Sequence, residues 1–155
     1  KTMITIKQIL VPVDFSDTSK LAMKYAAEFA HKFKAELHVI HAVEPIVYAS
    51  EPFAPINTGE IQITQGKMAR DEIAKWRREF IPEEIKTHED VLIGKAHPEI
   101  VRYAKKHKID IIIIGTHGRS GFDHFLLGST AEKVVRKAPC PVLTVHLMEH
   151  DIIRS

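Results

Sequence analysis

Short apolar runs alternate with amphipathic segments along the whole chain. The five runs have the length of buried strands, and they span residues 9–13, 36–43, 87–94, 110–114 and 141–146. Because helical patterns separate these runs, the strands are expected to connect through right-handed crossovers and to lie parallel. The sequence therefore predicts an α/β fold: a single open, doubly wound, Rossmann-like five-stranded parallel sheet with helices on both faces.

The intervening segments carry apolar residues at helical spacing. Ala69, Ile73, Trp76 and Phe80 mark the inner face of one helix, and Trp76 is expected in the core. A helix should open near residues 97–99 with Pro98 at its first position, and the last helix spans residues 129–137. The helix within residues 16–34 has a start rich in Ser, Asp and Thr and repeats Leu21, Ala22, Tyr25, Ala26, Phe29, Ala30 and Phe33.

The length of 155 residues suits one domain. We expect that domain to cover residues 3–148, with a C-terminal tail at residues 149–155. Residues 44–60 contain three prolines and one glycine, a content typical of a long irregular loop. No repeat or low-complexity tract divides the sequence.

Charge and cysteine content exclude several classes of protein. The 22 basic and 20 acidic residues are interspersed, and the basic clusters at residues 75–78 and 105–108 fit solvated helix faces rather than a nucleic-acid surface. The single cysteine, Cys140, rules out an internal disulfide framework and fits a reducing compartment. No apolar run has the length of a membrane span and no signal-peptide pattern is present, so we expect a cytoplasmic location with neither membrane nor nucleic acid as partner.

A glycine-rich loop follows the fourth predicted strand. Gly115, Gly118 and Gly128 are followed by Ser129 and Thr130 at a helix start. Glycine lets a backbone approach a ligand closely, and a helix N-terminus offers N–H groups and partial positive charge to an anion. The loop is thus a candidate polyphosphate site, with His117 and Arg119 as further phosphate partners. The alternatives are a tight turn for the glycines and a capping box for Ser129 with Glu132.

Asp14 is the second candidate, at the end of the first predicted strand. In open parallel sheets, ligands bind outside the carboxyl ends of the strands where the strand order reverses. A carboxylate there could hydrogen-bond a base or ribose, or hold Mg²⁺ that accompanies phosphates. Alternatively, Asp14 is the N-cap of the following helix.

Other chemistry finds little support in the sequence. Ten histidines and one cysteine occur without H-E-x-x-H or paired C-x-x-C, so a structural zinc site is not expected. His38 and His41 should point to opposite faces of their strand. The P-loop, the dinucleotide fingerprint and the hydrolase motif G-x-S-x-G are absent, and Ser129 stands where a P-loop has its lysine.

A family resemblance extends these readings. The chain resembles the ATP-binding branch of the universal stress protein family, through ILVPVDFS (9–16), HAVEP (41–45), GKAHPEIV (94–101), DIIIIGTHGRSG (110–121) and LLGSTAEKVVRKAPCPVLTV (126–145). Its glycines match the ATP signature of that branch, G-x2-G-x9-G-[ST]. The resemblance implies adenosine contacts from Pro12, Val13, Asp14 and Ala42, and phosphate and ribose contacts from Gly115, Gly118, Gly128, Ser129 and Thr130. Ala42 is smaller than the aliphatic residue that can occur there, so adenine should pack more loosely.

The functional hypothesis is an ATP-binding stress-response protein that hydrolyses ATP slowly or only with a partner, and so acts as a nucleotide-dependent switch. Phosphoryl transfer needs positioned metal and charge stabilisation, and no lysine of the sequence is placed to cradle the β and γ phosphates. Two alternatives stay open: an enzyme proper, either an ATPase or a phosphoryl or adenylyl transferase, and a nucleotide-free dimeric interaction module. The strand at residues 141–146 should lie at a sheet edge and join a homodimer through residues 142–146, as the resemblance also implies.

Overall fold

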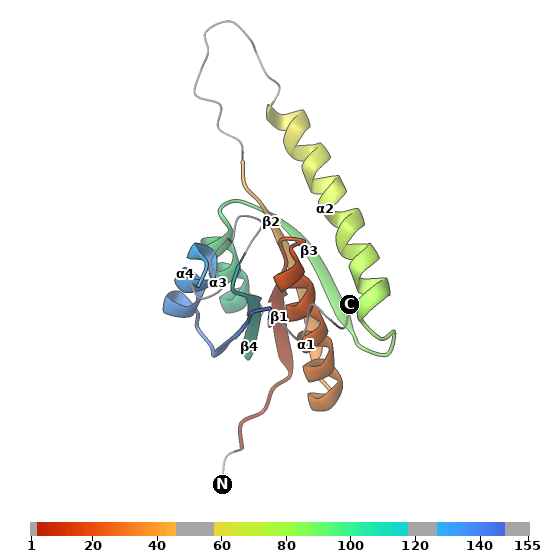
Figure 1. The fold of residues 1–155 in the computed structure, drawn as a ribbon, viewed down its shortest axis with the longest axis vertical. Helices are drawn as coiled ribbons and strands as arrows, with labels where there is room; N and C mark the ends of the chain where they lie inside the picture. The colour runs from red at the N-terminus through yellow and green to blue at the C-terminus, as the bar shows by residue number, and fades with distance from the viewer. Residues whose placement is uncertain (1–2, 46–57, 118–126, 148–155) are drawn as a thin grey trace, which may run out of the picture.

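The chain alternates strands and helices from end to end (Figure 1). The structure, a computed structural model, describes residues 3–45, 58–117 and 127–147. Within these residues the strands are β1 (Gln8–Pro12), β2 (Glu36–Val43), β3 (Thr87–Ile93), β4 (Ile111–Gly115) and β5 (Val142–Val145). The helices are α1 (Asp17–Phe33), α2 (Thr58–Phe80), α3 (Ala96–Lys106) and α4 (Ser129–Lys137).

The five strands form one parallel sheet in the order β3-β2-β1-β4-β5. Gln8 of β1 is in register with Glu36 of β2, and Ile9 of β1 is in register with Ile111 of β4. The chain first winds from β1 outward to β3 and then returns to build β4 and β5 on the other side of β1. The predicted fold is confirmed, and the strand order reverses between β1 and β4.

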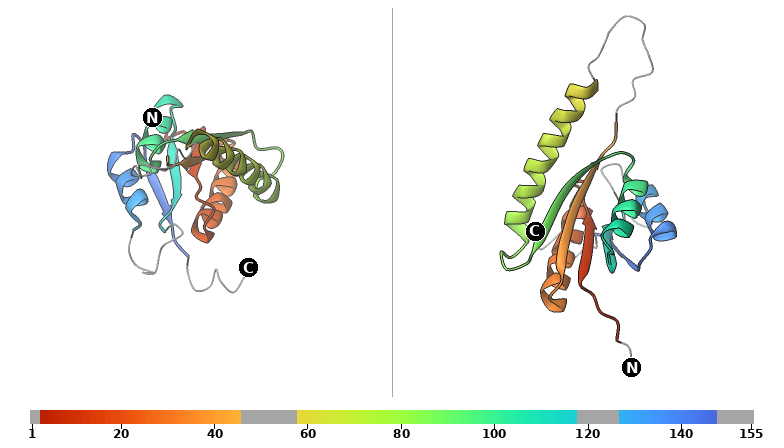
Figure 2. Two further views of the ribbon diagram at one scale, coloured as in Figure 1. Left: turned by 90° about the horizontal axis from the view of Figure 1, so that it is seen from above. Right: turned by 180° about the vertical axis from the view of Figure 1, so that it is seen from behind.

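Alternating side chains of the strands feed two hydrophobic cores, one on each face of the sheet. Ile9, Val11 and Val39 pack on the face covered by α1 and α2. Leu10, Ile40 and Ile112 point to the other face and pack with residues of α3 and α4. Figure 2 shows the two helix pairs on opposite sides of the sheet. All these strand residues are fully buried, as expected for a parallel sheet covered on both faces.

Helix α1 buries a narrow stripe of mostly small residues. Ser16 is its N-cap, and the Ser16 side chain accepts a hydrogen bond from the Ser19 N–H. Two of the aromatic residues that repeat at helical spacing, Tyr25 and Phe33, are 46% and 44% exposed. The buried residues are Thr18, Ser19, Ala22, Met23, Ala26, Ala27 and Ala30. The helix therefore packs on the sheet mainly through alanines, with Met23 as a large, fully buried side chain among them.

Helix α2 packs on the sheet only with its C-terminal half. Ala69, Ile73 and Trp76 are buried there as predicted, and Trp76 Nε1 donates to Glu72 Oε1 at 3.0 Å. Nearer its start, Ile63 and Met68 are 73% and 66% exposed. In Figure 1 this amino-terminal half rises past the carboxyl ends of the strands. It thereby forms a wall beside that end of the sheet.

Four local expectations need correction. The irregular loop predicted for residues 44–60 extends too far, because residues 58–60 form the first turn of α2. The N-cap of α4 is Gly128 and Ser129 is its first helical residue, so the capping box of Ser129 and Glu132 does not form. Pro98 occupies the third position of α3, which still lies in the first turn, where an N–H has no intrahelical acceptor. Asp110 precedes β4 instead of belonging to it, and its carboxylate accepts hydrogen bonds from the Lys7 and Gln8 N–H groups at 2.8 Å.

The basic clusters lie on helix surfaces or just beyond a helix end. The Lys75 side chain is 62% exposed, and Arg77 pairs with Glu89 at 3.5 Å. In the parts of the chain that the structure describes, no helix has both the length and the apolar character needed to cross a membrane. Absence of a nucleic-acid partner stays a prediction.

Candidate nucleotide-binding site

The turn after β1 is fixed by hydrogen bonds from its own polar side chains. The Val13 N–H donates to Ile40 O at 2.8 Å, and the Asp14 N–H donates to Ser19 Oγ at 3.2 Å. Asp14 Oδ1 accepts from both the N–H and the hydroxyl of Ser16, the N-cap of α1. Asp14 is therefore not the N-cap itself, and that alternative is wrong. It positions Ser16 and stands at the carboxyl end of β1.

Gly115 ends β4 directly against the start of α1. A Cβ at this position would lie 3.0 Å from the Ser19 nitrogen and 3.0 Å from the Thr18 carbonyl carbon. These are backbone atoms and cannot move aside cheaply. The glycine thus allows β4 and α1 to approach closely, and this packing explains its presence without a ligand. Its predicted contact with phosphate stays a prediction.

Gly128 brings the start of α4 onto the end of β4. Its N–H donates to Thr116 O at 2.5 Å, and a Cβ would lie only 2.4 Å from the same oxygen. The Gly128 φ of −59° is open to any residue, so glycine is needed here for space and not for backbone freedom. The contact fixes the N-terminus of α4 beside residues 116 and 117.

The first turn of α4 is not capped by a side chain. Gly128 has none to offer, and the first helical N–H groups have no acceptor within the helix. Ser129 is exposed and Thr130 is half-buried, so this end of the helix is accessible. Its N–H groups and the helix dipole together favour an anion. The arrangement has the properties that the sequence predicted for a phosphate site.

His117 lies beside this helix start. Its Nδ1 is 2.9 Å from Thr116 Oγ1, and its carbonyl oxygen accepts a hydrogen bond from Thr18 Oγ1 and lies 3.4 Å from Ser16 Oγ. The other ring nitrogen, Nε2, is buried and has no hydrogen-bond partner among the described residues. A buried polar atom normally has a partner, so this nitrogen is suited to meet a polar group of a ligand.

A cavity of about 540 Å³ opens on the other side of β1, between the end of β2 and α2. Its lining includes Phe15, His41, Ala42, Met68 and Ala69. His41 Nδ1 donates to Val13 O at 2.7 Å, and the His41 and Phe15 ring centroids are 4.7 Å apart. Glu44, Gln65 and Glu72 also line it, so the wall is partly polar. A cavity of this size with aromatic, apolar and a few polar groups suits one flat group of a small molecule.

Sequence reasoning missed Phe15 and His41 as components of this cavity. Phe15 adopts a φ of 64°, in the left-handed region that a bulky residue rarely visits. No pattern in the sequence signals that conformation. For His41, the sequence predicts only that it faces away from His38. The structure confirms this, since His41 contacts Val13 O whereas His38 contacts Tyr103 of α3.

The predicted site residues gather mainly at the carboxyl ends of β1 and β4. Hydrogen bonds and close contacts connect the segments 13–19, 115–117 and 128–130. Ala42 lies across β1, at the end of β2 and in the cavity wall. Gly118 and Arg119 lie outside the described residues. The members within the described residues are Pro12, Val13, Asp14, Ala42, Gly115, His117, Gly128, Ser129 and Thr130.

Comparisons with known proteins agree with this architecture. The model of the universal stress protein family matches residues 5–146. Universal stress protein MJ0531 of Methanocaldococcus jannaschii is 37% identical over 141 residues, which cover 90% of this chain and 81% of the relative. A universal stress protein of Thermus aquaticus is 36% identical, with 90% and 98% of the two chains covered.

Solved structures share the fold. The structure of MJ0577, a Methanocaldococcus jannaschii protein, superposes with a TM-score of 0.82 at 29% identity, covering 94% of this chain and 99% of its own. Universal stress protein UspA of Lactobacillus plantarum gives 0.80 at 28% identity, with 92% and 99% covered. Together with the family match, these likenesses identify the chain as a member of the universal stress protein family.

Proposed function

We propose that this protein binds ATP at the carboxyl ends of β1 and β4, with the phosphates at the start of α4. The observation that carries the proposal is the uncapped first turn of α4, held against the end of β4 by the contact of Gly128 with Thr116 O. Ser129 and Thr130 would meet the phosphates and ribose, and the buried His117 Nε2 would gain a partner. Gly118 and Arg119 are proposed as further contacts from the resemblance alone.

The adenosine part would extend along Pro12, Val13 and Asp14 toward Ala42 and the cavity beside it. Two universal stress proteins of this fold, each 23% identical to this chain, have been solved with adenine nucleotides: one with cAMP and one, from Archaeoglobus fulgidus, with dAMP. Their ligands support an adenine nucleotide as the class of ligand here. They do not distinguish ATP from the monophosphates.

Mg²⁺ would accompany the triphosphate, and Asp14 is the residue that would hold it. Mg²⁺ commonly takes one or two protein carboxylates, with phosphate oxygens and water as its other ligands. Asp14 Oδ1 is engaged by Ser16, and within the described residues Oδ2 has no hydrogen-bond donor, so one carboxylate oxygen fits that role. The ion would offset phosphate charge, while Asp14 itself orients the turn after β1.

The proposed role is a nucleotide-dependent switch in the stress response, in which hydrolysis is slow or requires a partner protein. Ser129 stands where a P-loop places its lysine, so strong charge stabilisation of the γ phosphate is not provided at that position. Purified protein should release ATP when denatured, as identified by mass spectrometry, and should form product at no more than a few turnovers with labelled ATP. Rapid turnover would favour the enzyme, and absence of any bound or titratable nucleotide would favour the interaction module.

A homodimer through β5 completes the proposal. β5 pairs with β4 on one side only and is an edge of the sheet in the described residues, as predicted. An unprotected edge recruits another strand. The proposed dimer joins two β5 strands across a two-fold axis. The cytoplasmic location expected from the sequence stays a prediction.

A further inference from the structure

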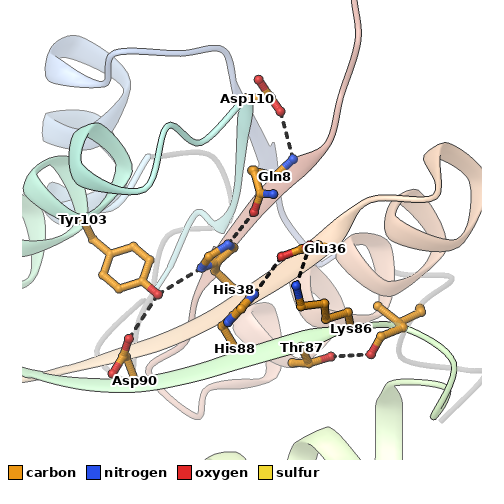
Figure 3. Close-up of polar contacts among 10 residues, drawn as sticks. Gln8, Glu36, His38, Lys86, Thr87, His88, Asp90, Tyr103 and Asp110 are labelled. Atoms are coloured by element: carbon orange, nitrogen blue, oxygen red, sulfur yellow. Dashed lines mark hydrogen bonds and ion pairs between the residues drawn. The ribbon is translucent and has the colours of Figure 1, made fainter.

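A cluster of polar side chains lies at the amino ends of β2 and β3, on the sheet face that α3 covers (Figure 3). His38 of β2 and His88 of β3 are neighbours in the parallel register, and Glu36 lies one pleat before His38 on the same face. The His38 and His88 rings stack with centroids 4.5 Å apart. This end of the sheet is opposite the proposed nucleotide site, and the function proposed above uses none of these residues.

The cluster holds three groups that commonly bind metal ions. One donor atom each from Glu36, His38 and His88 lie within 4.8 Å of one another. His88 Nε2 is 2.8 Å from Glu36 Oε2, while Lys86 Nζ holds the other carboxylate oxygen at 2.8 Å. Hydrogen bonds from Lys86 and His88 lower the pKa of Glu36 to about 2, so the carboxylate is ionised at neutral pH. Oε2 is thus oriented toward the histidines as a single charged donor.

His38 is held in one orientation by a relay of hydrogen bonds. Its Nδ1 lies 3.0 Å from the Tyr103 hydroxyl, which donates to Asp90 Oδ2 at 3.1 Å. Because the hydroxyl has one proton and gives it to Asp90, its oxygen accepts the Nδ1–H of His38. The lone pair of the neutral ring then lies on Nε2. Gln8 Oε1 is placed 2.7 Å from this nitrogen, and since an oxygen cannot donate, the Gln8 amide must be turned so that its NH2 group faces Nε2. Metal-binding histidines are characteristically fixed in this way through their second nitrogen.

The surroundings of His38 keep it a neutral donor. The ring is only 4% exposed, and burial, followed by the nearby His88 and His107, lowers the pKa of His38 to about 4. An unprotonated imidazole is the form that binds metal ions. The geometry brings the three metal-binding side chains together, and the surroundings of His38 keep its imidazole unprotonated at neutral pH.

We propose that Glu36, His38 and His88 bind a divalent transition-metal ion that prefers imidazole ligands, such as Zn²⁺. Two nitrogens and one carboxylate oxygen match the donor set of many zinc sites, and water would complete four ligands. A metal must lie near the plane of each ring, so the His38–His88 stack has to open. His88 can make this movement because its side chain is 40% exposed and comes from an edge strand.

The test uses the full-length protein, stripped with a chelator and titrated calorimetrically with Zn²⁺ alone, without nucleotide. Wild type should bind one Zn²⁺ per chain, and His88→Gln should weaken this binding by about tenfold or more. His31→Gln is the matched control, because His31 also pairs with a glutamate, Glu84 at 3.9 Å, on an exposed surface away from the cluster. That variant should bind Zn²⁺ as wild type does.

Co²⁺ gives a second readout, since its visible spectrum should report nitrogen ligands in wild type and in His31→Gln but not in His88→Gln. Circular dichroism checks that each variant is folded, and Glu36→Gln takes the place of His88→Gln if that variant is not. Loss confined to the cluster variants supports the site. Equal Zn²⁺ affinity in wild type and in the folded cluster variant, or absence of Zn²⁺ binding by wild type, overturns it.

Discussion

The two ends of the sheet are built in different ways. At the carboxyl end, the proposed nucleotide site depends on backbone: Gly115 and Gly128 allow close approaches, and the first turn of α4 presents N–H groups. At the amino end, side chains of neighbouring strands form the cluster of Glu36, His38 and His88 around one buried ring. A site built from backbone groups should be damaged by a Cβ added at one of its glycines but should tolerate replacement of many nearby side chains. A site built from side chains should be damaged by replacement of any of those side chains.

The difference predicts that each end can be damaged without the other. The two polar regions contact different helices, since residues 115–117 adjoin α1 and α4 while His38 contacts α3. Substitutions more than about 10 Å apart that share no partners usually act independently. Each of the following changes therefore tests both the local effect and its confinement to one end.

The largest effect is expected from Gly128→Ala. The added Cβ would meet Thr116 O at 2.4 Å, so the start of α4 has to move away from β4. ATP affinity should fall by about a hundredfold, or roughly 2.7 kcal/mol, by calorimetric titration. Overpacking should also lower the free energy of unfolding by about 1–3 kcal/mol. The spacing of the glycines in the sequence does not by itself predict this loss of stability.

Gly66→Ala is the matched control for that substitution. A Cβ at Gly66, inside α2, would meet only the end of the Arg70 side chain at 3.7 Å. The same chemical change should there leave ATP affinity intact and stabilise the helix by up to about 1 kcal/mol. Similar losses of affinity in both variants would remove the special role assigned to Gly128.

Tyr103→Phe tests the amino end. Removing the hydroxyl takes a hydrogen-bond partner from both His38 Nδ1 and Asp90 Oδ2. Urea denaturation should show a loss of about 1–3 kcal/mol, because Nδ1 of the buried His38 is left unpaired, whereas the exposed Asp90 carboxylate is solvated by water. Tyr25→Phe, at a 46% exposed position, should change stability by less than about 0.5 kcal/mol. ATP affinity should be unchanged in both variants. A loss of ATP affinity confined to Tyr103→Phe would show that the two ends of the sheet are energetically coupled.

Asp14→Asn returns to the carboxyl end and separates metal binding from shape. The amide keeps an oxygen for Ser16 but loses the charge that would hold Mg²⁺. Affinity for ATP should fall about tenfold, or roughly 1.4 kcal/mol, with Mg²⁺ present and little without it. Asp17→Asn, an exposed carboxylate in the first turn of α1, is the control. An equal loss with and without Mg²⁺ would assign Asp14 to the base or ribose instead.

The smallest effect concerns Cys140, which precedes β5 at the amino end of the sheet. Burial and, secondarily, Asp110 raise the pKa of its thiol above the ordinary value of 9.0. A raised pKa means less thiolate at any given pH, so Ellman's reagent should react more slowly with folded than with urea-unfolded protein. The folded rate should still be rising at a pH where the unfolded rate has levelled off. Equal rates would show that folding neither shields the thiol nor raises its pKa.

The sequence predicted the fold because strand and helix patterns are local. The bounds of β2 and α4 agree with the structure to the residue, and the predicted edge position of β5 is confirmed. The capping box failed because sequence cannot tell which residue before a helix is its cap. Here the close contact of Gly128 with Thr116 O decides, and it depends on where the chain returns in space.

The candidate site could be predicted from the sequence only in part, because it too depends on where distant segments meet in space. The glycine spacing predicts a phosphate region, and the structure shows that Gly115 and Gly128 have no room for a side chain against the neighbouring backbone, while phosphate binding stays a proposal. The cavity beside Ala42 could not be predicted from the sequence, since it needs the left-handed backbone of Phe15 and the distant helix α2. The histidine cluster was missed because its donors come from two strands, and no motif connects residues that only sheet register brings together.

Backbone amide chemical shifts, measured while Mg²⁺ and ATP are added, test whether the nucleotide binds at the start of α4. We expect the largest changes at residues 115–117 and 129–131, and none at Glu36, His38 or His88. Saturating ATP that leaves the first turn of α4 unperturbed, or that shifts the amino-end cluster instead, would contradict the proposed nucleotide site.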